Sequence, residues 1–176
     1  MKKTVFLIFL LIFFFLGSQS SLAKSDPTQV EYQLPYPGLL PDSPLYFLKA
    51  IRDKIIGFLI SDPLKKAEFD LIQADKRLNA GVYLLNKKKG KEELVQSTIS
   101  KGENYFEEAL EKVKEAKKQG INTEPALRKL SLAAKKHQEV LKNLENKAPQ
   151  NLKKSFSELR KRVADFEKQV NLLLSS

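Results

Sequence analysis

Residues 63–88 read PLKKAEFDLIQADKRLNAGVYLLNKK, and their apolar side chains recur at steps of three and four residues. That spacing places them on one face of an α-helix. The face consists of Leu64, Ala67, Leu71, Ala74, Leu78, Val82 and Leu85. The same alternation returns in three later segments, at about 92–119, 124–146 and 149–174. Four helices of similar length, each with one apolar face, are predicted to share one core.

The breaks between these segments are short, at 86–91, 120–124 and 146–150. Short links make consecutive helices antiparallel neighbours. We therefore predict an all-α fold, an up-down-up-down four-helix bundle within a single helical domain at 44–176. Gly102 interrupts the apolar face of the second long segment, at a cost of about 1 kcal/mol in helix propensity relative to alanine. We expect that it lets a bulky side chain or a backbone approach closely.

All eight prolines lie outside the predicted helix interiors. Four of them fall in residues 24–43, KSDPTQVEYQLPYPGLLPDS, which have no sustained apolar period. Because proline fixes its own φ and disfavours helix at the preceding residue, we expect an extended lead-in there. The other four stand at predicted helix starts, where the missing N–H has no intrahelical partner. They are Pro44, Pro63, Pro125 and Pro149.

The first predicted helix, at about 44–60, has a broader apolar face than the others. Its narrow polar strip consists of Lys49, Arg52, Asp53 and Lys54. One interpretation is a helix that braces the bundle and is largely covered by it. The other is a helix that binds a partner or a membrane surface. Burial of Phe47, Ile51 and Phe58 against the long helices would decide for the first.

The chain begins MKKTVFLIFLLIFFFLGSQSSLAKSD. Two lysines precede an unbroken apolar run at 5–16, and Ser21 and Ala23 are small residues at the positions that a signal peptidase requires. A spanning helix needs about 20 apolar residues, so the run is short for a permanent anchor. We predict a signal peptide at 1–23, cleaved near Ala23, with an uncleaved N-terminal anchor as the alternative. The protein is then extracytoplasmic: secreted, periplasmic or on the cell surface.

Lysines gather at one end of the predicted bundle. The chain has a net charge of +10, and the links at 86–91 and 146–150 share one end of an up-down-up-down bundle. The lysines of this tip are Lys87, Lys88, Lys89, Lys91, Lys147, Lys153 and Lys154. They form either a solubilising loop region or an anion-binding tip that contacts phosphates. No aromatic side chains interleave with them, so sequence-specific recognition of nucleic acid is not predicted.

Residues 37–78 contain two proline-marked helix starts, PGLLPDSPLYFLK and SDPLKKAEFDLIQADKRL. These strings resemble the bacterial family catalogued as Domain of Unknown Function 5667, in which an L-P-D-S-P-L-Y-x-L-K start precedes a D-P-x-x-K-A turn into a long helix. The matching positions are Leu40, Pro41, Asp42, Ser43, Pro44, Leu45, Tyr46, Leu48 and Lys49, then Asp62, Pro63, Lys66 and Ala67. The resemblance implies a secreted or surface-associated helical protein and supplies no site residue.

The motif also has a structural interpretation. Asp42 or Ser43 is expected to accept a backbone N–H at the first helix start, and Asp62 to do the same at the second. Two such starts would fix the angle between the short helix and the long one. The alternative is that the motif is a docking surface.

No residue pattern predicts catalysis. His137 is the only histidine, and it falls on an apolar face. A metal site or a Ser-His-Asp arrangement needs further partners, so we expect a partly buried histidine with hydrogen-bonded nitrogens. The clustered glutamates are expected on solvated helix faces. They are Glu92, Glu93, Glu107, Glu108 and Glu111. Within this group, Glu108 is spaced to pair with Lys112, and Glu111 with Lys114.

These observations predict an exported, non-enzymatic helical bundle without cofactor or metal. It would be a structural or protein-interaction module of the bacterial cell envelope, with an envelope protein as its partner. The alternative is an electrostatic binder of anionic polymers, a membrane surface or DNA through the lysine-rich tip. Apolar faces of this kind fit a bundle within one chain or between chains, so the oligomeric state stays open.

Overall fold

The computed structural model describes residues 30–87 and 91–176. Within these ranges the chain forms five α-helices and no strand. They are α2 (Tyr46–Leu59), α3 (Pro63–Lys87), α4 (Glu92–Lys118), α5 (Glu124–Lys147) and α6 (Gln150–Ser175). The predicted signal peptide at 1–23 and the beginning of the lead-in lie outside the described residues.

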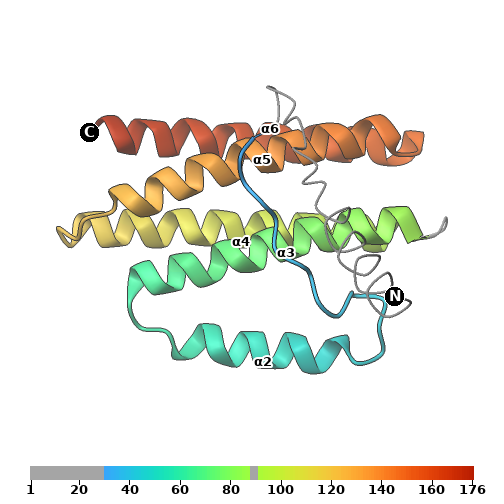
Figure 1. Cartoon of the computed structure of the whole chain (residues 1–176), viewed down its shortest axis with the longest axis horizontal. Coiled ribbons are helices and arrows are strands. Elements are labelled where there is room, and N and C mark those ends of the chain that lie inside the picture. Colours follow the sequence, from blue (N-terminus) through green and yellow to red (C-terminus); the bar gives the residue numbers. More distant parts are fainter. Residues whose placement is uncertain (1–29, 88–90) are drawn as a thin grey trace, which may run out of the picture.

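The four long helices form the predicted up-down-up-down bundle (Figure 1). α3 packs along α4 and α5 packs along α6, and the two hairpins meet through α3 with α5 and through α4 with α6. Each long helix therefore has two main neighbours around one core. α3 ends and α4 begins at the end of the bundle that holds the α5–α6 link, and the α4–α5 link lies at the other end (Figure 1).

The core consists of the predicted apolar faces. Leu78 of α3, Phe106 of α4, Leu141 of α5 and Phe156 of α6 are among its largest fully buried side chains. Phe106 also stacks on Phe166, with ring centroids 5.5 Å apart and an interplanar angle of 3°. Burying one such side chain stabilises the fold by about 1.5–3 kcal/mol.

Gly102 lies where α4 and α3 approach closely. A Cβ atom at this position would lie 3.2 Å from the carbonyl oxygen of Ala74 and 3.4 Å from the backbone nitrogen of Leu78. The prediction of a close approach at Gly102 is confirmed, and the neighbour is the backbone of α3. Gly81 acts similarly from α3, since a Cβ there would lie 2.3 Å from Cγ1 of Ile99.

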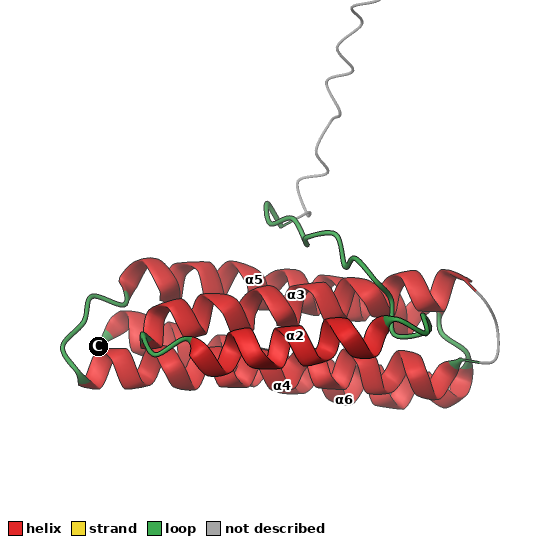
Figure 2. Ribbon diagram, turned by 90° about the horizontal axis from the view of Figure 1, so that it is seen from below, coloured by secondary structure: helices red, strands yellow, loops and turns green. Residues whose placement is uncertain are grey.

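α2 lies outside the four-helix bundle and runs alongside α3 (Figures 1 and 2). It begins at Tyr46, two residues later than predicted, because residues 41–45 form turns and a bend. Among the described helices, including α2, none is both long and apolar enough to cross a membrane.

The two helix starts of the motif are capped differently. At the start of α3, the backbone N–H of Lys65 donates to Oδ1 of Asp62 over 2.8 Å, as predicted. Ahead of α2, the N–H of Leu45 reaches Oγ of Ser43 only over 3.4 Å. The helix start at Asp62 is therefore the firmly capped one. Asp42 has a different role, described below.

Residues 30–43, here called the N-terminal segment, cross the bundle surface without helix or strand before they reach α2 (Figure 1). Three of their side chains, Tyr32, Leu34 and Leu40, pack against the core. Residues 30–40 of this segment run without helix or strand, in keeping with the predicted extended lead-in, whereas residues 41–43 already form turns and a bend. The N-terminal segment thus lies against α3 and α5, although it precedes both helices in the sequence.

Candidate functional site

The described lysines of the tip lie at one end of the bundle, where α3 ends, α4 begins and α5 connects to α6 (Figure 1). Lys91 and Lys147 line a groove of about 540 Å³ at this end, together with Glu92. Lys153 and Lys154 follow in the first turns of α6. Lys88 and Lys89 lie outside the described residues. The structure therefore brings the described lysines of the tip to the same end, as the topology requires.

Asp42 neutralises part of that tip. Its Oδ2 lies 3.0 Å from Nζ of Lys91 and 3.5 Å from Nζ of Lys87. The hydrogen bond from Lys91 lowers the pKa of Asp42, and the charge of Lys87 adds to the effect. Two of the lysines predicted for anion binding thus pair with a carboxylate from the N-terminal segment. Lys147 and Lys153 form no ion pair within the described part of the chain.

The predicted glutamate pairs are partly confirmed. Glu111 pairs with Lys114 over 2.6 Å, as its spacing indicated. Lys112 does not pair with Glu108; it pairs with Glu115 over 2.6 Å. Glu107 binds Arg162 of α6, also over 2.6 Å. These contacts lie on solvated helix surfaces.

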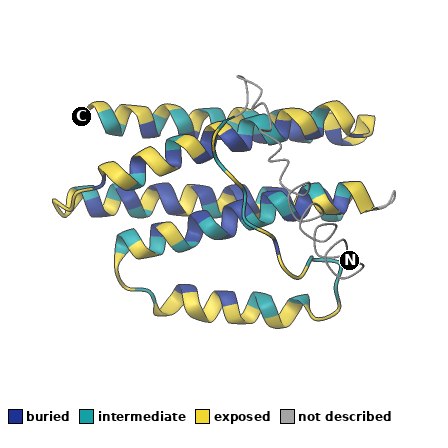
Figure 3. Cartoon of the chain, in the orientation of Figure 1, coloured by how far each residue is buried: buried dark blue, intermediate teal, exposed yellow. Residues whose placement is uncertain are grey.

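α2 turns its apolar side away from the bundle. Six large apolar side chains form what we call the outward face of α2. They are Phe47, Leu48, Ile51, Ile55, Phe58 and Leu59. Phe47, Ile51 and Phe58 are 58%, 53% and 86% exposed, and Figure 3 shows most of the helix as exposed. The prediction that the bundle largely covers this helix is wrong.

The reason lies in the side of α2 that meets the bundle. Asp53 and Gly57 are its buried residues, so part of the strip predicted to face solvent faces inward. Burial alone would raise the pKa of Asp53, but hydrogen bonds from Arg52 and Lys49 outweigh it and lower the pKa. α2 is thus packed through a narrow, largely polar side, and its broad apolar side is left open.

Two contacts hold α2 against α3. Nη1 of Arg77 donates a hydrogen bond to the hydroxyl oxygen of Tyr46 over 3.0 Å. The ring of Phe69 lies over Gly57, where a Cβ atom would come within 3.0 Å of Cε1. A side chain at Gly57 would require the Phe69 ring to shift.

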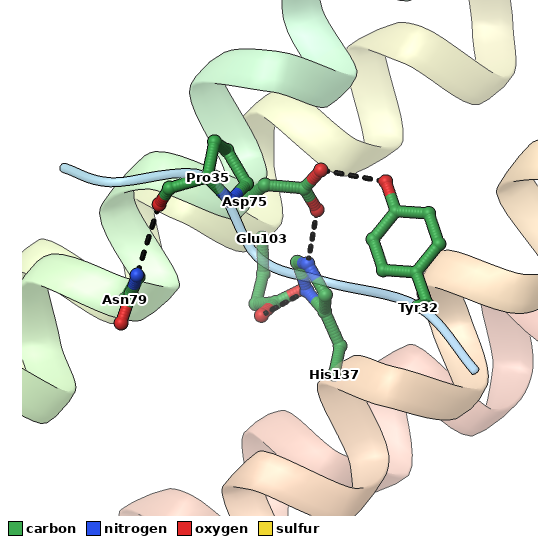
Figure 4. Close-up of polar contacts among 6 residues, drawn as sticks. All are labelled: Tyr32, Pro35, Asp75, Asn79, Glu103 and His137. Carbon is green, nitrogen blue, oxygen red and sulfur yellow. Dashed lines mark hydrogen bonds and ion pairs between the residues drawn. The ribbon is translucent and has the colours of Figure 1, made fainter. Parts of the chain in front are cut away.

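A second feature is a buried polar cluster around His137, drawn in Figure 4. His137 is fully buried in α5, and its Nε2 lies 2.9 Å from Oδ1 of Asp75 in α3. Its Nδ1 lies 3.0 Å from Oε1 of Glu103 in α4. From the N-terminal segment, the hydroxyl of Tyr32 donates to Oδ2 of Asp75 over 2.6 Å. The prediction that both nitrogens of His137 are hydrogen-bonded is confirmed, but the side chain is fully rather than partly buried.

The cluster holds a positive charge between two carboxylates. Burial alone would lower the pKa of His137, but the charge of Glu103 and the hydrogen bonds to Asp75 and Glu103 raise it to about 9. Both ring nitrogens therefore donate at neutral pH. Burial, then the charge of Asp75, raises the pKa of Tyr32, which keeps its hydroxyl a donor.

The cluster fastens the N-terminal segment to the bundle. Besides the Tyr32 hydroxyl, the backbone N–H of Val30 donates to Oε2 of Glu139 over 3.1 Å. Nδ2 of Asn79 donates to the carbonyl oxygen of Pro35 over 2.9 Å (Figure 4). All partners of His137 are thus structural, and no group of three or more possible ligands in the described ranges is arranged to hold a metal ion.

Sequence reasoning missed the partners of His137. Asp75 and Glu103 each follow an apolar-face position by one residue, next to Ala74 and Gly102. The available signal was an acidic residue beside the apolar stripe of α3 and another beside that of α4, together with a histidine within the apolar stripe of α5.

No curated protein and no solved structure matches the chain. A family model described as a domain of unknown function, DUF5667, matches residues 38–151. The match begins ahead of α2, runs through α3, α4 and α5, and ends in the first turn of α6. It therefore extends well beyond the strings at 37–78 that carry the resemblance. Since it covers more than half of the chain, this protein belongs to the DUF5667 family.

Proposed function

We propose that this protein is an exported, non-enzymatic interaction module of the bacterial cell envelope, and that the outward face of α2 is its working surface. One observation carries the proposal: six large apolar side chains of one short helix face away from a well-packed bundle. Each forgoes part of the about 1.5–3 kcal/mol that complete burial of such a side chain provides. Exposed apolar surfaces of this continuity mark interaction sites.

Two further observations support the proposal. The leader-like sequence at 1–23 favours export. His137 binds Asp75 and Glu103 through its two ring nitrogens. The buried titratable groups around His137 therefore stabilise the fold. The outward face of α2 is then a continuous apolar surface that packing within the described chain leaves without a partner.

Cysteine labelling in cells tests export and the working surface together. The chain has no cysteine, so Ile55→Cys and the control Leu132→Cys each introduce one thiol on an exposed apolar position. A small, membrane-impermeant maleimide is applied to intact bacteria and to the purified proteins. We expect Leu132→Cys to react equally in both, and Ile55→Cys to react at least about fivefold more slowly in cells because its partner covers it.

Equal labelling of Ile55→Cys in cells and in solution would contradict the working surface. Labelling of neither variant until the cells are lysed would contradict export.

The lysine-rich tip supports a second candidate function, the binding of an anionic polymer. One observation favours it. Within the described ranges, neither Lys147, which lines the groove, nor Lys153 forms an ion pair. Replacing Lys147, Lys153 and Lys154 with glutamine should weaken salt-sensitive binding to DNA or an anionic wall polymer. The matched control replaces Lys118, Lys135 and Lys142, which are exposed elsewhere. Equal loss in both variants would leave only a non-specific charge effect.

A further inference from the structure

We infer that the outward face of α2 binds the surface of an anionic lipid bilayer, where α2 lies as a peripheral amphipathic helix. The inference rests on the proposed function and names the partner of that surface. In such helices the apolar side chains enter the boundary between headgroups and acyl chains. Basic residues at the edges of the apolar face contact the anionic headgroups.

The position of α2 suits a planar partner. Figures 1 and 2 show α2 as the outermost helix, with its axis along the length of the bundle. Its 14 residues span about 21 Å at a rise of 1.5 Å per residue. A flat surface can therefore contact the outward face from Phe47 to Leu59 without first meeting the four long helices.

The charges around the outward face suit an anionic surface. Successive helical residues are about 100° apart, which puts Lys54 at one border of the face and Arg52 at the other. Both residues are exposed. The one acidic residue of α2, Asp53, is buried on the opposite side, where Lys49 and Arg52 pair with it. The outward side of α2 thus combines apolar surface with the positive charge of Lys54, and Arg52 keeps 62% of its side chain exposed while it pairs with Asp53.

The same charges disfavour a second copy of the chain as the partner. In a two-fold pair of antiparallel α2 helices, the middle of one helix meets the middle of the other. Arg52 and Lys54 lie near that middle, so pairing would gather four basic side chains with no exposed acidic residue of α2 between them. Like charges brought together in this way oppose association.

The attachment of α2 permits the bilayer contact without rearrangement. The contacts of Tyr46 with Arg77 and of Gly57 with Phe69 use the inward side of the helix. The outward face needs no unpacking before it binds. Affinity is then set by the apolar area that enters the interface and by the attraction of the basic borders to the headgroups.

Vesicle flotation tests the inference. The exported chain, with the N-terminus that export leaves, is mixed with phosphatidylcholine vesicles that contain or lack phosphatidylglycerol. One variant combines Phe47→Ser, Ile51→Ser and Phe58→Ser. Its matched control replaces three exposed apolar side chains elsewhere and combines Tyr83→Ser, Leu132→Ser and Leu172→Ser. Wild type and control should float with the anionic vesicles, and the affinity of the α2 variant should fall at least about tenfold.

A second variant, Arg52→Gln with Lys54→Gln, tests the basic borders. It should bind anionic vesicles several-fold more weakly than wild type and with a smaller dependence on salt. Binding of the Ser variant at wild-type strength, or no binding of wild type to either vesicle, would overturn the inference. Circular dichroism and urea unfolding check that the variants fold. We expect them to fold because the replaced side chains are exposed.

Tryptophan fluorescence reports which side chain enters the lipid. The chain has no tryptophan, so Phe58→Trp and the control Leu132→Trp each introduce one reporter. Anionic vesicles should shift the emission of Phe58→Trp to the blue, and brominated acyl chains should quench it. Leu132→Trp should show neither effect. The same response from both reporters would overturn the assignment to α2.

Labelling in cells and binding to vesicles separate the two proposals. If Ile55→Cys is protected in cells but wild type does not bind vesicles, the working surface stands and its partner is a protein, so the membrane inference fails. A wild-type dimer that the Ser variant cannot form would also overturn it, in favour of a second copy. If Ile55→Cys is not protected, both proposals fail.

Discussion

α2 and α4 are both amphipathic helices, yet they bury opposite sides. α4 buries its apolar face, with Phe106 fully enclosed between the two hairpins, and places most of its charged residues outside. α2 buries Asp53 and Gly57 and leaves Phe58 86% exposed. Both arrangements occur within one chain, so the same kind of periodicity has two outcomes.

The contrast teaches what apolar periodicity specifies. It identifies the face whose removal from water is favourable. It does not identify what covers that face. For α4 the cover is the rest of the bundle, whereas the described chain leaves most of the apolar face of α2 exposed.

The largest expected effect on stability comes from replacing one phenylalanine in each of the two helices, Phe106 in α4 and Phe58 in α2. Phe106→Ala should lower the free energy of unfolding by about 3–5 kcal/mol, because it leaves a cavity in the core. Phe58→Ala should change it by less than about 0.5 kcal/mol, because the ring is exposed. Urea denaturation measures both. Similar losses would show that α2 is covered after all.

The buried histidine should make stability depend on pH. Its pKa is raised from 6.5 to about 9, so its stabilising contribution is complete below pH 6.5 and is lost as the pH rises through about 9. The loss amounts to at most about 3 kcal/mol. The groups that face the ring are Asp75 and Glu103, and Tyr32 acts through Asp75.

Unfolding free energies between pH 6.5 and 9 check this dependence, with His137→Gln as the variant that should lose it. An equal slope in wild type and variant would mean that another group titrates. Asp53 of α2 does not contribute to the pH dependence between pH 6.5 and 9, because its pKa is lowered.

A smaller loss should follow from releasing the N-terminal segment. Tyr32→Phe removes the hydroxyl that donates to Asp75 over 2.6 Å and leaves one carboxylate oxygen without that donor. A hydrogen bond to a charged group contributes about 1.5–3 kcal/mol, so urea unfolding should show a loss of about 2 kcal/mol. The control, Tyr36→Phe, changes a ring that is 71% exposed and should cost less than about 0.5 kcal/mol. Equal effects would show that Tyr32 does not anchor the segment.

Most of the fold was predictable from the sequence because the bundle obeys local rules. The apolar stripes through Leu78 and Phe106 gave the long helices, the short links gave the topology, and Gly102 marked a close contact. Pro63 after Asp62 marked a capped helix start. Each of these features depends on residues near one another in the chain, or on the one core that all four helices share.

The candidate site was less predictable because it depends on which faces meet. Nothing in residues 46–59 shows that Asp53 would be held inward by Lys49 and Arg52, with Gly57 against the ring of Phe69. Short links were enough to place Lys91 and Lys147 at one end of the bundle, but the pairing of Lys87 and Lys91 with Asp42 joins residues more than forty positions apart. Contacts of that kind follow from the assembled fold.

The smallest expected effect tests whether α2 belongs to the same cooperative unit as the bundle. Tyr46→Phe removes the hydroxyl oxygen that accepts from Arg77. Arg77 is charged and half-buried, so this hydrogen bond lies at the low end of the about 1.5–3 kcal/mol that bonds to charged groups contribute. Hydrogen exchange should therefore accelerate about tenfold in α2 peptides and stay unchanged in α4 peptides. If α4 exchanges faster by the same factor, α2 unfolds only with the whole bundle. If α2 alone responds, the helix opens independently, which is the behaviour expected of an element attached by its polar side.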